Sequence, residues 1–376
     1  MNTHPDHLSR AVINLDHLTH NMGLLQELAG TRPMWPAIKA NAYGHGIEII
    51  ARHLLKLGYD TLCVAHVTEA IELIEAGIDA KFILLSASLP AHSEAIVRYG
   101  CEPAICTFDM VEALTADAER LGKQVTVHLM VDTGMGRIGI SPDEVVPFLA
   151  RCRQYPALHV RGLMSHFPCA DEADKKLSRD ETKHFQLVIE KARAYGTEVH
   201  HMANSAAIFD LPDAHFDVVR PGIAIYGLAP SSEIVNPRVH ELKPVLEWKS
   251  RITFLKELPA GTGLSYGHAF HTHRPSLIAT IPAGYGDGLS RSLSNNLDVL
   301  VRGRRCPQAG RITMDQSLVD VTALRGQVEL GDEVVLIGRQ DDELVTADEL
   351  ADRIDTINYE IVTSIAQRVP RLTTGE

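Results

Sequence analysis

A lysine at the end of an apolar run is the residue whose position most clearly suggests chemistry. Lys39 ends a predicted strand at 35–39 and begins a short segment rich in alanine and glycine. An amine at the end of a buried strand is partly desolvated, which lowers its pKa. Such an amine is suited to form a Schiff base with an aldehyde. For Lys39 alone, a solvated lysine that only closes a strand remains the alternative.

Further polar residues follow the later predicted strands and change the interpretation of Lys39. They are His166 after the sixth strand, Asn204 and Ser205 after the seventh, and Arg220, Gly222 and Ile223 after the eighth. Barrels commonly bind phosphate in the loops after strands seven and eight, through backbone N–H groups and hydroxyls. A lysine, such a phosphate loop and a strand-end arginine together indicate a site for pyridoxal 5'-phosphate. Each residue alone also has a structural explanation, such as an N-cap for Ser205.

The first part of the chain alternates short apolar runs with amphipathic stretches. We predict strands at 35–39, 61–66, 81–86, 102–106, 125–131, 160–166, 198–203 and 217–221, and helices at 47–57, 69–76, 109–121, 144–155 and 179–195. Repeated strand–helix order favours a parallel sheet with right-handed crossovers. Eight strands in roughly 210 residues fit a closed (β/α)8 barrel better than an open sheet. We therefore predict an α/β protein whose TIM-like barrel covers 1–240.

The pattern changes after about Pro237, where apolar segments are separated by turns. We predict strands at 245–256, 276–282, 297–302, 317–322 and 333–338, one helix with Thr346 as its N-cap, and another at 359–368. These features predict a mainly-β domain over 241–376. Because no low-complexity linker separates the two domains, we expect them to pack against each other.

Composition excludes several classes of partner. The chain has 36 Lys and Arg against 48 Asp and Glu, a formal charge of −12, which gives no electrostatic support for nucleic-acid binding. No apolar run approaches the roughly 18 residues of a membrane helix, and the N-terminus lacks the apolar core of a signal peptide. The six cysteines show no close pairing such as C-x-x-C, which indicates reduced thiols in a cytoplasmic protein. The histidine clusters lack zinc-site spacing, so we expect no metal.

With these residues in view, the chain resembles the alanine racemases, and the likeness extends across both parts of the sequence. The matching segments are 37–46 around Lys39, the arginine loop at 132–139, and the stretches 201–205, 220–227, 264–267, 282–288 and 313–316. The segment around Lys39 is specific by itself, and the order of all seven leaves little room for chance. The resemblance implies a fold-type III pyridoxal-phosphate enzyme, an isomerase that supplies D-alanine for peptidoglycan and cell-wall synthesis.

The resemblance also implies a role for each matching residue. Lys39 holds the cofactor and is the base on one face of the substrate, and Tyr266 of the partner subunit is the base on the other face. The cofactor contacts are Tyr43, His166, Asn204, Ser205, Arg220, Gly222, Ile223 and Tyr359, with Arg220 at the pyridine nitrogen and His166 between Arg220 and Tyr266. Arg137 and Met314 of the partner subunit hold the substrate carboxylate, and Tyr285 of the partner subunit narrows the entrance. The implied assembly is a homodimer with shared active sites.

One position departs from the family pattern. Many alanine racemases carry a lysine two residues before the aspartate of the arginine loop, modified to a carbamate that orients the arginine. Met130 occupies that position here and cannot be carbamylated. An anion or another acceptor must then orient Arg137, or Arg137 is held less firmly.

The implied residues fit the chemistry of racemisation. The Cα proton leaves one face and returns on the other, so two opposed bases are expected. Lysine and tyrosine have ordinary pKa values of about 10.4 and 10, which must be lowered for catalysis near neutral pH. Arg220, relayed through His166, favours tyrosinate at Tyr266. Because Arg220 is an obligate donor, it also discourages protonation of the pyridine nitrogen and so suppresses transamination.

Three other functions are alternatives to alanine racemisation. A pyridoxal-phosphate homeostasis protein has no β domain, whereas about 140 residues follow the predicted barrel here. A basic amino-acid decarboxylase places an acidic residue at the pyridine nitrogen and uses a late cysteine, whereas Arg220 stands here and Cys306 lies outside a matching motif. A racemase of broader specificity, for serine among others, stays open, because pocket width depends on packing.

Overall fold

The computed structural model describes residues 7–375, and its contacts divide them into two compact units. The barrel unit comprises 17–42 and 47–243, and the β unit comprises the described residues through Asp16, the short segment 43–46, and 244 onward. The domain ranges 1–240 and 241–376 remain a prediction. In the structure the first strand of the chain, β1 (Arg10–Asn14), and the segment 43–46 group with the β unit, whereas residues 39–42 belong to the barrel unit.

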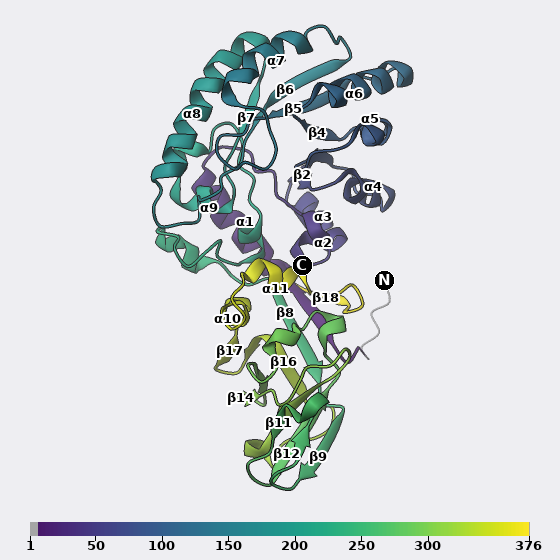
Figure 1. Ribbon diagram of the computed structural model, residues 1–376, viewed down its shortest axis with the longest axis vertical. Helices are drawn as coiled ribbons and strands as arrows, with labels where there is room; N and C mark the ends of the chain where they lie inside the picture. The colour runs from purple at the N-terminus through teal and green to yellow at the C-terminus, as the bar shows by residue number, and fades with distance from the viewer. Residues whose placement is uncertain (1–6, 376) are drawn as a thin grey trace. The chain divides into compact units, whose positions relative to one another are not determined.

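Six parallel strands form the regular part of the barrel wall, in the order in which they occur in the chain (Figure 1). They are β2 (Thr61–Val64), β3 (Lys81–Leu84), β4 (Glu102–Ile105), β5 (Val125–Met130), β6 (Leu158–Met164) and β7 (Val199–His201). Two extended segments complete the ring through single parallel bridges, which pair Ala37 with Cys63, Met34 with Val219, and His201 with Val218. The predicted parallel (β/α)8 arrangement is therefore confirmed.

The segments predicted as the first and eighth strands do not form regular strands. Each makes only isolated bridges to its neighbours, and each contains a proline, Pro36 in the first and Pro221 in the last. Proline has no N–H to donate, so it interrupts a ladder of backbone hydrogen bonds. The functional loops thus begin on irregular wall segments, which explains why the strand prediction failed there.

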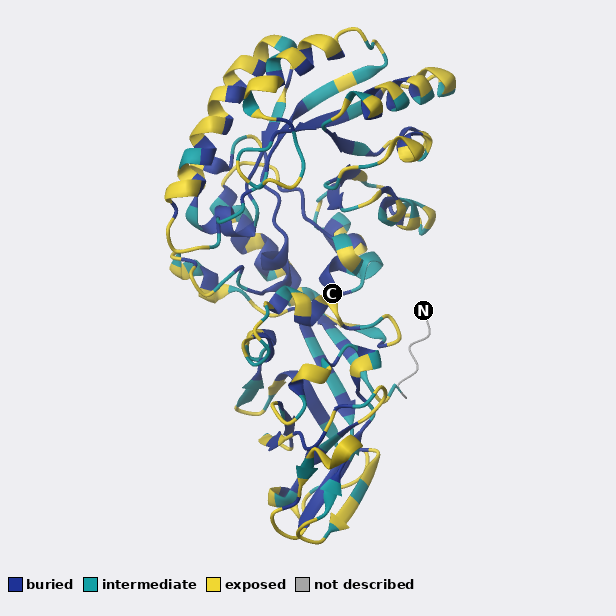
Figure 2. Ribbon diagram, in the orientation of Figure 1, coloured by how far each residue is buried: buried dark blue, intermediate teal, exposed yellow. Residues whose placement is uncertain are grey.

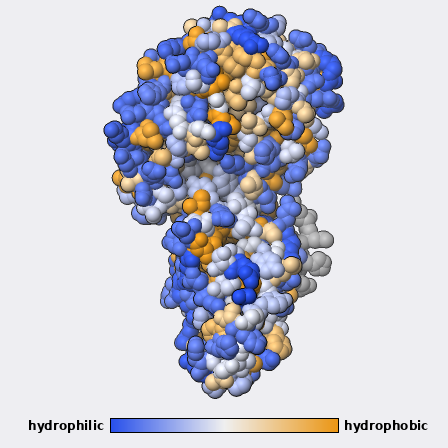
Figure 3. Space-filling model, in the orientation of Figure 1, coloured by the Kyte–Doolittle hydropathy of each residue, from blue (hydrophilic) through white to orange (hydrophobic). Residues whose placement is uncertain are grey.

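Helices surround the strands, with their buried residues turned toward the barrel wall and their exposed residues turned outward (Figure 2). They are α1 (Leu15–Ala29), α3 (Ile47–Lys56), α4 (Val67–Glu75), α5 (Ser93–Tyr99), α6 (Phe108–Leu121), α7 (Val145–Cys152), α8 (Lys176–Ala192) and the short α9 (Ser205–Asp210). Helix α6 shows the local rules: Thr107 caps its start by accepting from the Met110 N–H, and Gly122 ends it in the left-handed region. Hydrophilic side chains cover much of the outer rim where these helices lie (Figure 3).

The β unit is built on one larger sheet and one smaller sheet. The larger sheet has the order β14 (Arg304–Pro307), β13 (Asp298–Val301), β16 (Glu333–Gln340), β8 (Leu246–Arg251), β1 (Arg10–Asn14) and β18 (Arg371–Thr374), with β17 (Glu343–Val345) beside β16. The smaller sheet joins β15 (Ser317–Asp320), β12 (Ser276–Ile281) and β9 (Phe254–Leu258), and a short pair joins β10 (Gly263–Leu264) to β11 (Phe270–His271). The mainly-β prediction for this part of the chain is confirmed.

Two details of the β unit differ from the sequence prediction. The strand predicted at 245–256 is two strands, β8 and β9, which belong to different sheets. The last predicted helix is only α11 (Asn358–Thr363), whereas α10 (Ala347–Asp352) begins as predicted, with the Thr346 hydroxyl accepting from the Glu349 N–H at 2.9 Å. Across residues 7–375, no helix is long and apolar enough to cross a membrane.

Candidate active site

Lys39 begins an unusual turn at the point where the chain leaves the barrel wall. Helix α2 (Lys39–Tyr43) is left-handed: its last four residues all have φ between 51° and 53°. L-residues avoid this region, at a cost of about 1–2 kcal/mol for each residue. Consecutive strained residues persist only where the surroundings hold them, and such strain clusters at functional sites. The backbone around Lys39 therefore marks this position independently of its side chain.

Two side chains of the barrel unit hold that turn. Glu69 accepts the Ala40 N–H at 2.6 Å with one carboxylate oxygen, while its other oxygen accepts the Ala65 N–H at 2.7 Å at the start of α4. Asn41 accepts the Ile47 N–H at 2.9 Å at the start of α3. Sequence reasoning missed Glu69, although a glutamate at the third position of a helix that follows a strand is a recognisable capping signal.

The electrostatic surroundings of Lys39 favour a neutral amine. Burial lowers the pKa of the Lys39 amine most, and the Arg137 guanidinium lowers it further. Glu69 and Cys63 oppose this shift, and Arg220 adds a smaller lowering effect. Two cations near the amine destabilise its protonated form. The structure therefore brings Lys39 near the predicted arginines, in surroundings that lower the pKa of its amine.

Arg220 is a buried cation without a carboxylate partner among the described residues. Its Nη2 donates to the Ser165 carbonyl at 2.7 Å, and its Nη1 donates to Nδ1 of His201. Burial lowers the pKa of the Arg220 guanidinium to about 10, so the group stays protonated at neutral pH. Its other N–H groups remain for a ligand acceptor, since its acceptors among the described residues are one imidazole nitrogen and backbone carbonyls.

His166 lies among the same cations. Burial lowers the pKa of the His166 imidazole to about 3, with Arg220, Arg137 and Lys39 acting in the same direction. The imidazole is therefore neutral at physiological pH and can both donate and accept a hydrogen bond. The structure brings together these four predicted residues of the barrel unit.

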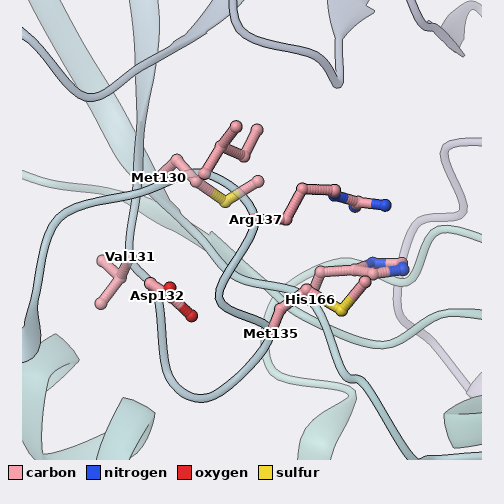
Figure 4. A pocket seen from close by; sticks show the side chains of 7 residues that line it. Met130, Val131, Asp132, Met135, Arg137 and His166 are labelled. Atoms are coloured by element: carbon pink, nitrogen blue, oxygen red, sulfur yellow. The ribbon is translucent and has the colours of Figure 1, made fainter.

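The arginine loop is held by its own aspartate. Asp132 accepts the N–H groups of Gly134 and Gly136, both at 3.0 Å. Figure 4 shows Arg137 and His166 lining one pocket with their nitrogen-bearing ends directed the same way. Arg137 is exposed and makes no hydrogen bond to another described residue. Its guanidinium is thus free to meet an anionic group.

Met130 lines the same pocket but belongs to an apolar cluster. The side chain is only 4% exposed and packs with Ala104 and Met164, against which Leu85 and Ile138 also lie. A thioether in such a cluster supplies no strong acceptor. The position at which the resemblance implies a modified lysine is therefore filled here by hydrocarbon and sulfur.

Backbone N–H groups and a hydroxyl converge beyond β7. The Ser205 hydroxyl oxygen accepts the Gly222 N–H at 2.8 Å and the Ala224 N–H at 3.2 Å. Ile223 lies buried between these two residues, and Asn204 caps α9 by accepting the Ala207 N–H at 3.0 Å. The Gly222 and Ala224 N–H groups are thus satisfied by Ser205, which leaves the hydroxyl hydrogen of Ser205 and the backbone N–H of Ile223 as donors for a phosphate group. The predicted Ser205, Gly222 and Ile223 are thus brought together.

The remaining predicted residues belong to the β unit. Tyr43 and Tyr359 lie near each other there, with ring centroids 6.1 Å apart. Tyr266, Tyr285 and Met314 are 71%, 43% and 53% exposed. Backbone contacts nevertheless fix the last two, since the Tyr285 N–H donates to the Thr313 carbonyl at 2.9 Å and the Gly286 N–H to the Met314 carbonyl at 2.8 Å.

Family models match almost the whole chain. The model described as the alanine racemase N-terminal domain matches residues 13–230, and the model of the alanine racemase C-terminal domain matches residues 245–373. These ranges contain every candidate residue described above.

Individual relatives agree with the family models. An alanine racemase of Halothermothrix orenii is 43% identical over 96% of this chain and 95% of its own length, and one of Carboxydothermus hydrogenoformans is 42% identical over 96% and 98%. Among solved structures, the alanine racemase of Streptomyces coelicolor gives a TM-score of 0.91 at 36% identity and covers 98% of both chains.

Proposed function

Because the chain belongs to the alanine racemase family, we propose that it interconverts L-alanine and D-alanine with Lys39 and Tyr266 as opposed bases. The observation that carries this proposal is the surroundings of Lys39. Its pKa is lowered beside Arg220 and Arg137, and it begins a strained left-handed turn. The relatives are named for alanine, which does not favour the serine alternative.

The barrel residues fit pyridoxal 5'-phosphate. The Ser205 hydroxyl, which accepts the Gly222 N–H at 2.8 Å, and the Ile223 backbone N–H suit the phosphate. Arg220 offers N–H groups to a ring nitrogen and has no carboxylate partner among the described residues, which suits a nitrogen that stays unprotonated. When bound, the cofactor supplies the electron-withdrawing system that acidifies the Cα proton of alanine. Asn204, Tyr43 and Tyr359 complete the proposed binding set.

The chain's own residues then move one proton on each face of the substrate. Lys39 Nζ takes or returns the Cα proton on one face, because its neutral form is favoured by burial and by neighbouring cations. The Tyr266 hydroxyl of the partner subunit does so on the opposite face, with His166 linking it to Arg220. Arg137 pairs with the substrate carboxylate, helped by Met314 of the partner subunit, and Tyr285 of the partner subunit narrows the entrance.

The exposure of these β-unit side chains supports a homodimer. A tyrosine that is 71% exposed is poorly placed to act as a base until another surface surrounds it. In a symmetric dimer each barrel would receive the β-unit residues of the other chain. The proposed setting is the cytoplasm, where D-alanine is made for peptidoglycan.

Borohydride reduction followed by peptide mapping tests the assignment of Lys39. We expect the cofactor on the peptide that contains Lys39, and we expect Lys39→Ala to lose both this label and alanine racemisation. The exposed Lys56→Ala on α3 is the matched control and should keep both. Cofactor on a different lysine would overturn the assignment, and a panel of L-amino acids would show whether alanine is preferred to serine.

A further inference from the structure

A chain of buried polar side chains crosses the interior of the barrel unit and ends on Arg220. Nη1 of Arg220 contacts Nδ1 of His201, and Nε2 of His201 lies 3.0 Å from Nδ1 of His128. Nε2 of His128 lies 2.9 Å from Oε2 of Glu102. Both oxygens of Glu102 also accept from Nη1 of Arg161 at 3.0 Å. This hydrogen-bond network therefore joins side chains of β4, β5 and β7 to Arg220.

Elementary donor and acceptor rules fix every proton in this chain. Arginine can only donate, so Nδ1 of His201 must accept and its Nε2 must carry the proton. That proton is donated to Nδ1 of His128, whose own proton must then be on Nε2. Nε2 of His128 donates to Glu102, which must be an ionised carboxylate because Arg161 donates to it as well. A cation and an anion are thus connected by two neutral imidazoles in one arrangement.

The surroundings support neutral imidazoles. His128 and His201 are both 0% exposed, and burial is the main cause that lowers the pKa of each. The Trp35 ring packs against them, with centroids 5.7 Å and 5.0 Å away. Both nitrogens of each imidazole are bonded, so the chain satisfies all of these buried polar atoms.

We propose that Glu102 is a positioning residue for Arg220, acting through His128 and His201. This inference rests on the proposed function, which gives Arg220 its ligand. The carboxylate polarises the two imidazoles and makes Nδ1 of His201 a stronger acceptor. That acceptor fixes Nη1 of Arg220 while the Ser165 carbonyl fixes Nη2. The remaining N–H groups are then held in one direction, toward a ring nitrogen.

Replacing the carboxylate by its amide tests this role. Glu102→Gln keeps the shape but removes the charge, and we expect kcat for alanine racemisation to fall by roughly 2- to 30-fold while KM changes little. Glu112→Gln is the matched control, because Glu112 also pairs with an arginine of the barrel unit, Arg151, at 3.1 Å but lies on its exposed outer side. A Glu102→Gln enzyme that behaves like Glu112→Gln would overturn the proposal.

A double-mutant cycle separates positioning from packing. If Glu102 acts through His201, Glu102→Gln should have almost no effect on kcat in a His201→Gln background. Equal fold-changes in both backgrounds would mean that Glu102 acts only on local packing, and the proposal would be wrong.

A second measurement does not depend on activity, and its readout is taken on the native protein. In the full-length native protein without added cofactor, NMR of ring-labelled [15N]histidine should show both imidazoles neutral, with the proton on Nε2, across pH 6–8. His128→Gln and His201→Gln serve only to assign the two signals. A proton on Nδ1 of either ring would contradict the proposed hydrogen-bond network. A native protein that shows these tautomers but does not racemise alanine would instead refute the proposed function.

Discussion

The two units present their candidate residues in opposite ways. In the barrel unit, Arg220 and His166 are buried among groups of the same unit, and this burial is the main cause that lowers the pKa of each, to about 10 and about 3. In the β unit, Tyr266 and Met314 are more than half exposed, although backbone hydrogen bonds fix the loop that carries Met314. The barrel unit thus provides the surroundings of its own candidate residues. The β unit presents residues whose surroundings must come from elsewhere.

This difference gives different expectations for mutations in the two units. Substitutions in the barrel unit change buried hydrogen bonds and charges, so they affect stability as well as activity. Substitutions of exposed β-unit side chains leave the fold intact and change activity alone. The predictions below test this contrast, beginning with the largest expected effect.

Mixing two inactive variants should restore activity if the sites are shared between chains. Lys39→Ala removes the barrel base and Tyr266→Phe removes the β-unit base, so each homodimer should be nearly inactive. After full subunit exchange, half of the dimers carry one intact site, and activity should rise to about a quarter of the native value. The measurement is racemisation after exchange, verified by mass spectrometry with one variant isotope-labelled. Exchanged dimers that stay inactive would show that each chain supplies both bases to its own site.

The Tyr266→Phe variant alone should separate the two faces of the substrate. We expect exchange of the Cα proton of D-alanine with deuterated solvent to continue through Lys39, whereas exchange from L-alanine collapses. A positioned acid–base group commonly contributes about 10²- to 10⁴-fold, so the ratio between enantiomers should change by that order. The two enantiomers serve as controls for each other, because any general loss of cofactor affects both. Equal loss from both would rule out the two-base mechanism.

The sequence revealed those parts of the barrel site that depend on residue type and strand order. Lys39, Ser205 and Gly222 were found because an amine, a hydroxyl and a glycine after strands have few purely structural reasons to occur together. The left-handed turn after Lys39 was not predicted, since its four strained residues include no glycine. Local preference disfavours that conformation, and only tertiary contacts such as the one from Glu69 to Ala40 maintain it.

The buried network was missed for a related reason. Glu102 meets His128 across neighbouring strands, 26 residues apart in the chain, and His128 meets His201 across 73 residues. Nothing in the local pattern around these residues signals such partners. In the structure, Nδ1 of His201 accepts from Arg220, a partner 19 residues later in the chain.

Glu181 on α8 is a buried carboxyl group of the barrel unit, and the effect expected from its substitution, a pH-dependent change in stability, is the smallest of those predicted. Its side chain is 2% exposed, and neither carboxylate oxygen has a hydrogen-bond partner among the described residues. It lies against Gly134 of the arginine loop, where an added Cβ would be 2.1 Å from Oε1. Burial, together with the nearby Asp132 carboxylate, raises the pKa of Glu181 to about 7. Ionising Glu181 in the folded protein is therefore unfavourable.

The pH dependence follows from comparing folded and unfolded chains. Below the ordinary glutamate pKa of about 4.3, Glu181 is protonated in both states and its burial adds no ionisation cost. As the pH rises to about 7, the unfolded chain gives up the proton while the folded chain keeps it, so stability falls. Above that pH the cost is constant, at most about 3.5 kcal/mol from the size of the shift. Glu181→Gln is neutral at every pH, so it should raise the thermal midpoint at pH 8 and change it little at pH 4.5.

Glu257→Gln in the β unit is the contrasting control. Glu257 is exposed and paired with Arg325 at 2.7 Å, and such pairs contribute about 0–1 kcal/mol to stability. Both variants are compared with the native chain at one protein concentration, because dimer formation makes the midpoint depend on concentration. A gain for Glu181→Gln that is the same at both pH values would show that it comes from packing, and the buried carboxyl would not be the titrating group that we predict.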